Sequence, residues 1–227
     1  MRRATIPSPV GARSPPVKTM RTEHEQLEAA VRQAWDGNDF ERAATLAFEG
    51  YGDELLAFLV GRLRSPSDGQ EVFSMFAEDL WVGLPSFGWR SSLRTWAYTI
   101  ARNAAVRYLR DPQRRGERNL TLSKHASVSR VAEQVRSRTA KHMRTDVKDR
   151  VRALRDQLDA DDQLLLELRI DQGMSFRDAA QVMMGEVEGE GDTDPAVLDR
   201  EAARLRKRFE RVKVELKRMA QAQGLIS

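Results

Sequence analysis

The stretch FGWRSSLRTWAYTIARNAAVRYLRD, residues 87–111, decides how the rest of the chain is interpreted. Apolar residues recur in it every three or four positions, which predicts an amphipathic helix. Ser91 or Ser92 is suited to cap its start, and the Asp111–Pro112 pair ends it. We therefore expect a helix with one face in a core and a polar face opposite.

The polar face of this predicted helix combines basic, hydroxyl and aromatic groups. No carboxylate occurs from Arg90 to Arg110, so the ion pairs between residues four apart that stabilise a solvated helix are missing. We therefore expect the arginines to lack partners within the chain and to bind an anion. Arginine, asparagine, threonine and tyrosine contact phosphates, pair with base edges and stack on exposed bases, which favours nucleic acid. A surface helix with solvated charges is the alternative.

The composition excludes several classes of function but does not identify one. The chain of 227 residues is 32% charged and has a formal net charge of +4, which permits a polyanionic partner. It has no cysteine, which excludes disulfides and thiolate metal sites and fits a reducing cytoplasm. Its three histidines are not at metal-ligand spacing, and no phosphate-binding glycine loop, nucleophile elbow or H-E-x-x-H motif occurs. We expect neither catalysis nor a metal or cofactor.

Helical periodicity runs along the chain from about residue 21 and predicts an all-α protein with two small helical domains. Residues 1–20 are rich in proline and lack a signal-peptide core, so we expect a disordered tail. Residues 21–111 are the first domain, the basic residues 112–147 a linker, and residues 148–227 the second domain. No apolar run is long enough to span a membrane, and we expect a cytoplasmic protein.

The expected helices follow from apolar spacing, caps and breaks such as Gly37–Asn38. In the first domain they are 23–35, 39–48, 53–64, 68–84 and the helix ending near Arg110. The linker has one near 128–135, and the second domain has 148–157, 160–171, 175–184 and 196–222.

The second domain has features of a helix-turn-helix. Gly173 is suited to end a helix, and Ser175 with Asp178 makes a capping pair at the start of the next one. The last helix has an apolar stripe and a basic face, as do helices that enter the major groove of DNA. A solvated face or a coiled-coil surface is the alternative. The basic residues are Arg204, Arg206, Lys207, Arg208 and Arg211.

The phrase SSLRTWAYTIARNAAVRYLR resembles conserved region 2 of the extracytoplasmic-function sigma factors of bacterial RNA polymerase. The preceding helix and the turn with Leu84, Pro85 and Phe87 are similar to that family's polymerase-binding helix and its leucine-proline-x-phenylalanine turn. The resemblance covers about residues 40–115, and AARLRKRFERVK resembles the recognition helix of the family's region 4. It implies a non-enzymatic protein that binds core RNA polymerase, recognises minus-ten and minus-thirty-five promoter elements, and promotes DNA opening. The basic face of the last helix would then bind the minus-thirty-five duplex.

The resemblance also implies roles for single residues. The family's specificity loop, which captures a flipped base, corresponds to residues 85–92, and the helix behind it would bind the rest of the single strand. The implied strand-binding residues are Trp89, Arg90, Ser91, Arg94, Trp96, Tyr98, Arg102 and Asn103, although Trp96 is equally suited to the core. The implied contacts with the clamp of the largest polymerase subunit, expected to be exposed, are Glu71, Ser74, Met75, Glu78 and Asp79. Here the sequence departs from the family, since Ser74 stands in place of a usual glutamine.

A glycine-rich acidic insertion, residues 185–197, stands where the family has a tight turn. Its carboxylates would repel a DNA backbone, so it loops away from the duplex, weakens minus-thirty-five recognition, or shields the basic helix until polymerase binds. Two functions stay open. One is a dissociable polymerase subunit, whose partners would include an anti-sigma factor. The other is a duplex-binding helix-turn-helix regulator that acts without core polymerase.

Overall fold

The computed structural model describes residues 17–110, 126–139, 153–185 and 194–225. All regular elements within these residues are helical, so the prediction of an all-α fold is confirmed. The helices are α1 (Val17–Asp36), α2 (Phe40–Leu63), α3 (Pro66–Gly83), α4 (Leu93–Arg110), α5 (Ala126–Thr139), α7 (Ala160–Leu166), α8 (Phe176–Met184) and α9 (Pro195–Ala222). A short 3-10 turn, Leu84–Ser86, follows α3, and a π-helical turn, Glu167–Asp171, extends α7. None of these helices is both long enough and apolar enough to cross a bilayer.

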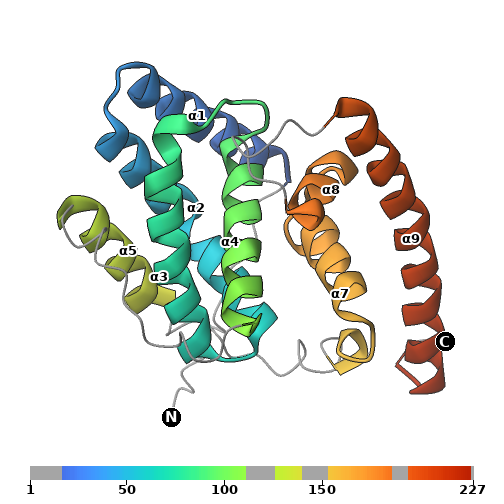
Figure 1. Ribbon diagram of the computed structural model, residues 1–227. Helices are drawn as coiled ribbons and strands as arrows, with labels where there is room; N and C mark the ends of the chain where they lie inside the picture. Colours follow the sequence, from blue (N-terminus) through green and yellow to red (C-terminus); the bar gives the residue numbers. More distant parts are fainter. Residues whose placement is uncertain (1–16, 111–125, 140–152, 186–193, 226–227) are drawn as a thin grey trace, which may run out of the picture.

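The helices are arranged around α2 and α4 (Figure 1). Helix α2 packs against α1, α3 and α5, and α4 packs against α2 and α3. On its other side α4 contacts α8, which in turn packs against α9. Helix α4 therefore lies between the elements predicted for the first domain and those predicted for the second.

Helix α2 is continuous, although the sequence predicted two helices broken near Gly50 and Gly52. Glycine inside a helix costs roughly 0.5–1 kcal/mol relative to alanine, so its presence needs a reason. A Cβ on Gly50 would lie 2.0 Å from Leu27 of α1, and one on Gly52 would lie 2.8 Å from Val135 of α5. The two glycines therefore permit close helix contacts and do not mark a break.

The ends of the predicted segments need correction. Helix α1 begins at Val17, so residues 17–20 are helical and are not part of a disordered tail. Helix α3 begins at Pro66, because Ser65 and not Asp68 caps it: Ser65 Oγ accepts the Asp68 N–H at 3.2 Å. Residues 1–16 lie outside the described residues.

The predicted linker contains the expected helix, α5, which is described over residues 126–139. Its Val128, Ala132 and Val135 are buried, and it packs mainly on α2. The rest of the linker lies outside the described residues. The helix predicted over 148–157 is described only from residue 153.

The three helices predicted after residue 160 are present, and the last of them begins at Pro195, within the acidic insertion predicted over residues 185–197. Gly185 ends α8 with a φ of 74°, and Asp194 caps α9 by accepting the Ala196 N–H at 2.9 Å. The residues between them, 186–193, lie outside the described part of the chain.

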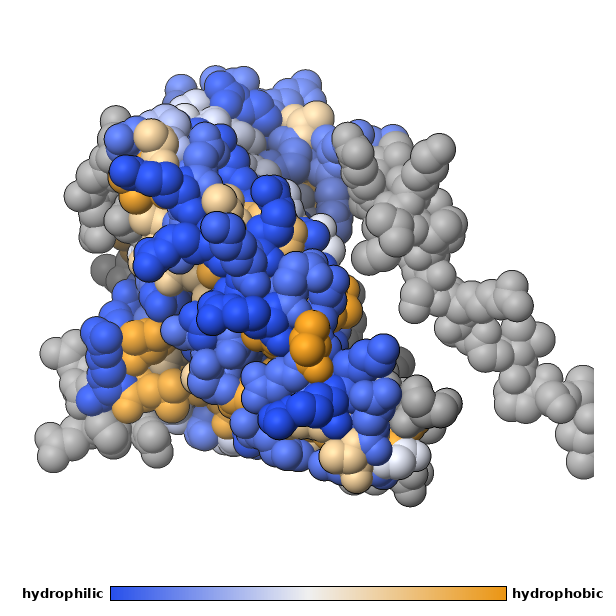
Figure 2. Space-filling model, turned by 90° about the vertical axis from the view of Figure 1, so that its right-hand side faces the viewer, coloured by the Kyte–Doolittle hydropathy of each residue, from blue (hydrophilic) through white to orange (hydrophobic). Residues whose placement is uncertain are grey.

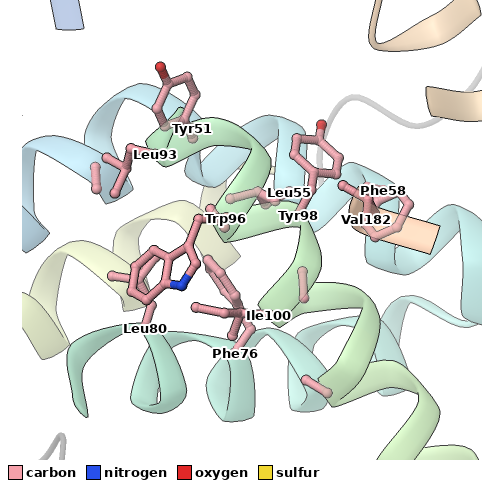
Figure 3. Packing of buried hydrophobic residues seen from close by; sticks show 14 of the residues in the cluster. Tyr51, Leu55, Phe58, Phe76, Leu80, Leu93, Trp96, Tyr98, Ile100 and Val182 are labelled. Carbon is pink, nitrogen blue, oxygen red and sulfur yellow. The ribbon is translucent and has the colours of Figure 1, made fainter. Parts of the chain in front are cut away.

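One continuous cluster of buried side chains runs from α1 to α9 through the contact between α4 and α8. Figure 3 shows Trp96 of α4 pointing toward Leu80 and Phe76, and Tyr98 lying beside Phe58 and Val182. Val182 belongs to α8, so the two predicted domains share a core at this point. The boundaries between them stay a prediction.

Candidate nucleic-acid interface

The loop over residues 87–92 is held against α1. The Trp89 ring packs edge-on against Trp35, with centroids 6.1 Å apart, and the Arg32 guanidinium lies 4.7 Å above it. Trp35 Nε1 donates to the Leu84 carbonyl at 2.8 Å, which fixes the start of the turn. Trp89 has a φ of 58°, a conformation that is strained for a bulky side chain and that occurs often at functional sites.

A carboxylate from α1 caps the start of α4. Glu28 accepts the N–H groups of Leu93 and Arg94, both at 2.9 Å, and the Tyr51 hydroxyl donates to it at 3.0 Å. A negative charge is favourable at this end of a helix. Burial and the Glu28 carboxylate raise the pKa of Tyr51. The predicted Ser92 cap is also present, with Ser92 Oγ accepting the Thr95 N–H at 3.0 Å.

Trp96 lies in the core, which was the alternative to a role in strand binding. It is 1% exposed and stacks on Phe87 with ring centroids 4.6 Å apart. A Cβ on Gly83 would lie 3.1 Å from the Trp96 ring, so the glycine makes room for the indole. Trp96 is therefore not accessible to DNA in this arrangement.

The expectation that the arginines of α4 lack internal partners is wrong for Arg94. Its Nε and Nη2 donate to the two carboxylate oxygens of Glu54 at 2.8 and 3.1 Å, and both side chains are largely buried. Its Nη1 also donates to the Gln172 carbonyl at 3.1 Å. Arg107 pairs with Asp79. These acids belong to α2 and α3, so spacing within α4 gave no sign of them.

Tyr98 and the threonines beside it are buried as well. The Tyr98 ring is fully buried, 5.1 Å from the Phe58 ring, with the Arg94 guanidinium 5.2 Å away. Burial raises its pKa well above the ordinary value. Thr95 Oγ1 donates to Asp178 of α8 at 3.1 Å. This part of the polar face is therefore covered by α8.

The C-terminal half of the polar face meets the end of α8. Arg102 Nη1 donates to Asn103 Oδ1 at 3.1 Å, and Asn103 Nδ2 donates to the Gly185 carbonyl at 2.7 Å. Burial and the neighbouring guanidinium of Arg62 lower the pKa of Arg102. Among the described residues, Nε of Arg62 and Nε of Arg102 are buried without an acceptor. The two guanidiniums therefore repel each other, and the Asp161 carboxylate opposes this effect on the pKa of Arg102.

The comparison with protein families matches the segment that builds this loop and helix. Residues 47–115 match Sigma-70 region 2. This segment comprises most of α2, all of α3, the loop and α4. A Sigma-70 region 2 domain supports a sigma factor, with a role in RNA polymerase binding and promoter melting. Comparisons of the chain with curated proteins and with solved structures gave no significant match.

The polymerase-binding candidates lie on α3 of the region 2 segment, and the expectation that they are exposed is wrong for Glu78. Glu78 is buried, and the other four, Glu71, Ser74, Met75 and Asp79, are half-buried. The Tyr108 hydroxyl lies 3.3 Å from Glu71 Oε2, and Arg136 of α5 contacts Ser74. Contacts with α4 and α5, which sequence spacing does not show, account for this burial. Burial raises the pKa of Asp79, against the opposing effect of Arg107.

Outside the region 2 segment, the basic face of α9 divides into two parts. Arg204, Arg206, Lys207 and Arg211 are exposed, and Figure 2, which looks onto this side of the molecule, shows mostly hydrophilic residues there. Arg208 is half-buried and holds α9 to the start of α7. Its guanidinium lies 2.8 Å from Asp159 and also pairs with Asp162. Arg208 is therefore paired within the fold, unlike the side chains that stay exposed, and its contact with DNA stays a prediction.

Sequence reasoning missed residues whose contacts are distant in the chain. Glu28, Glu54 and the acidic start of α7 each hold a predicted binding element in place. The capping pair at Ser175 and Asp178 was predicted and is present, with Ser175 Oγ accepting the Asp178 N–H at 3.1 Å. Within the described residues no group of three or more His, Asp or Glu could hold a metal ion.

Proposed function

We propose that the chain is a sigma factor of the extracytoplasmic-function type, which acts in the cytoplasm with bacterial core RNA polymerase. The observation that carries the proposal is the match of residues 47–115 to Sigma-70 region 2. The matched segment includes the loop and α4, where a single DNA strand would bind. The polymerase supplies the chemistry of RNA synthesis, and this chain supplies recognition of the promoter.

In the proposed complex, the unpaired minus-ten strand binds the loop and the polar face of α4. Arg90 is exposed and Ser91 is half-buried, and both lie at the rim of the loop. Arg102 and Asn103 supply a guanidinium and an amide at the other end, beside Arg62. Such contacts with the phosphates and bases of the unpaired strand would offset the cost of separating the strands.

The aromatic residues have a different role in this proposal. Trp89 is held between Trp35, Phe87 and Arg32, so it shapes the loop and does not extend into solvent. Trp96 supports the loop from the core. The pocket for a flipped base would then form at the surface next to Arg90.

Two further surfaces belong to the proposal. The half-buried residues of α3, Glu71, Ser74, Met75 and Asp79, would contact the polymerase clamp through the parts of their side chains that stay accessible, whereas Glu78 is buried. The exposed residues of α9, Arg204, Arg206, Lys207 and Arg211, would contact the minus-thirty-five duplex. Arg208 would instead hold α9 in place for that contact.

Gel filtration with bacterial core RNA polymerase tests the proposal, with a parallel run of the protein and random duplex DNA. Co-elution with the polymerase and none with the duplex supports a sigma factor. Duplex binding without polymerase binding would instead support a helix-turn-helix regulator. With promoter DNA, Asn103→Ala should impair strand opening more than polymerase binding. Equal losses would mean that Asn103 is structural.

A further inference from the structure

Helix α8 and the residues next to it cover the N-terminal part of the polar face of α4, from Arg94 to Asn103. The contacts run in the same order on both helices, with Thr95 meeting Asp178 near the start of α8 and Asn103 meeting Gly185 at its end. Just before α8, Gln172 meets Arg94 through its carbonyl and side-chain oxygens, at 3.1 and 3.3 Å. The two helices therefore run side by side in the same direction.

The contacts pair donors on α4 with acceptors from the second unit. The α4 donors are a guanidinium, a hydroxyl and an amide, and the acceptors are a carboxylate oxygen and amide carbonyl oxygens. A DNA strand offers phosphate oxygens and base carbonyls, which are acceptors of the same kind. Helix α8, together with Gln172 before it and Gly185 after it, thus occupies donors that a strand would need.

The end of α8 fits its site on α4 closely. Gly185 has a φ of 74°, which glycine adopts without strain, and a Cβ there would lie 2.4 Å from Arg102 Nη1 and 2.8 Å from Asn103 Oδ1. The C-terminal carbonyls of a helix carry partial negative charge, which is favourable next to a guanidinium. Gly185 therefore permits the approach of α8 to the two α4 residues proposed to hold the strand.

We propose that α8 and a single DNA strand compete for the same face of α4, so that the closed arrangement keeps the free protein from binding unpaired DNA. The inference rests on the proposed role of α4 in strand binding. Arg204, Lys207 and Arg211 of α9 stay exposed in the same arrangement. Closure thus hides the strand-binding face and leaves the basic face of α9 accessible.

Substitutions in α8 test the competition without changing α4. Gly185→Ala adds a strained residue and a steric clash at the contact with Arg102 and Asn103. Val182→Asp places a carboxylate in the buried contact beside Tyr98. Arg177→Ala is the matched control, because its side chain on α8 is half-exposed and pairs with Asp199 of α9. Far-UV circular dichroism confirms that each variant is folded.

Two measurements follow on the full chain. Because the chain has no cysteine, Val82→Cys on α3 and Val214→Cys on α9, both highly exposed, can carry a donor and an acceptor dye. Energy transfer between the dyes reports separation of the two units. Fluorescence anisotropy then measures the affinity of the protein for a single-stranded oligonucleotide pool of random sequence. We expect Gly185→Ala and Val182→Asp to lower energy transfer and to tighten strand binding about tenfold, because more molecules are open.

The outcomes separate this inference from the proposed function. Folded variants that show lower energy transfer but unchanged strand affinity would overturn the competition. Unchanged energy transfer in both variants would show that α8 does not hold the units together, which overturns it as well. Failure to co-elute with core RNA polymerase would instead count against the sigma-factor proposal, whatever the strand affinities are.

Discussion

The buried ion pair between Arg94 and Glu54 gives the sharpest prediction on stability. Breaking a buried pair by removing one partner costs about 3–5 kcal/mol, because the other charge is left uncompensated. The two side chains keep 13% and 22% of their exposure, and Arg94 retains its bonds to Gln172. We therefore expect Glu54→Leu to lower the free energy of unfolding by about 2–3 kcal/mol, at or below the lower limit of that range.

A double-mutant cycle isolates the pair. Glu54→Leu with Arg94→Met removes both charges at similar volume, so its cost should be well below the sum of the single costs, with a coupling of about 2 kcal/mol. Urea unfolding followed by circular dichroism measures all four proteins. The control pair is Arg107 and Asp79, whose side chains are 54% and 32% exposed. Its coupling should be about 0–1 kcal/mol, as for surface pairs.

The result that would refute this reasoning is a coupling at Arg94 and Glu54 no larger than that of the control pair. Arg94 would then be solvated in solution and available to an external anion, as the sequence alone suggested. A large coupling would mean that Arg94 serves mainly to join α4 to α2.

Three further predictions concern other contacts. Glu28→Ala should lower the free energy of unfolding by about 2–3 kcal/mol, measured in urea, because three donors lose a carboxylate acceptor. The pKa values of Tyr51 and Tyr98 are raised in the folded protein, so with rising pH the unfolded chain loses the two hydroxyl protons before the folded protein does. The free energy of unfolding should therefore fall as the pH rises above about 10. Urea unfolding across that pH range should show a smaller fall for Tyr98→Phe. Lys207→Ala should reduce the salt dependence of duplex binding by about one unit of slope, whereas Arg208→Ala should chiefly lower stability.

Each of these predictions has a control or a contrary outcome. Glu23→Ala, on the exposed side of α1, should leave stability nearly unchanged, and a loss equal to that of Glu28→Ala would contradict the capping role. An unaltered alkaline fall in Tyr98→Phe would assign the effect to other groups. A salt slope lowered as much by Arg208→Ala as by Lys207→Ala would place Arg208 on the DNA.

Local sequence signals predicted the helices well, because caps and apolar periodicity act over a few residues. The capping pair at Ser175 and Asp178, the left-handed Gly173 and the long final helix were all found in this way. The break predicted within α2 was wrong because Gly50 and Gly52 make room for side chains of α1 and α5 and do not end a helix. Such contacts depend on the assembled fold.

The site was harder to predict for the same reason. A row of arginines without nearby acids suggested an external anion, but Glu54 is forty residues before Arg94 in the chain. Polarity alone also could not distinguish a face that binds DNA from a face that binds another helix, since both require matched hydrogen bonds. Asn103, which donates to the Gly185 carbonyl, shows how one residue suits both partners.

The contact between α8 and α4 has a consequence for how inhibition depends on the amount of protein in the cell. Both helices belong to one polypeptide, so the share of molecules with α4 covered is set by an intramolecular equilibrium and does not change with protein concentration. An inhibitor on a separate chain can be outnumbered when its target is overproduced. Helix α8 is part of the same polypeptide as α4, so overproduction of the protein supplies one α8 for every α4 and does not relieve the inhibition.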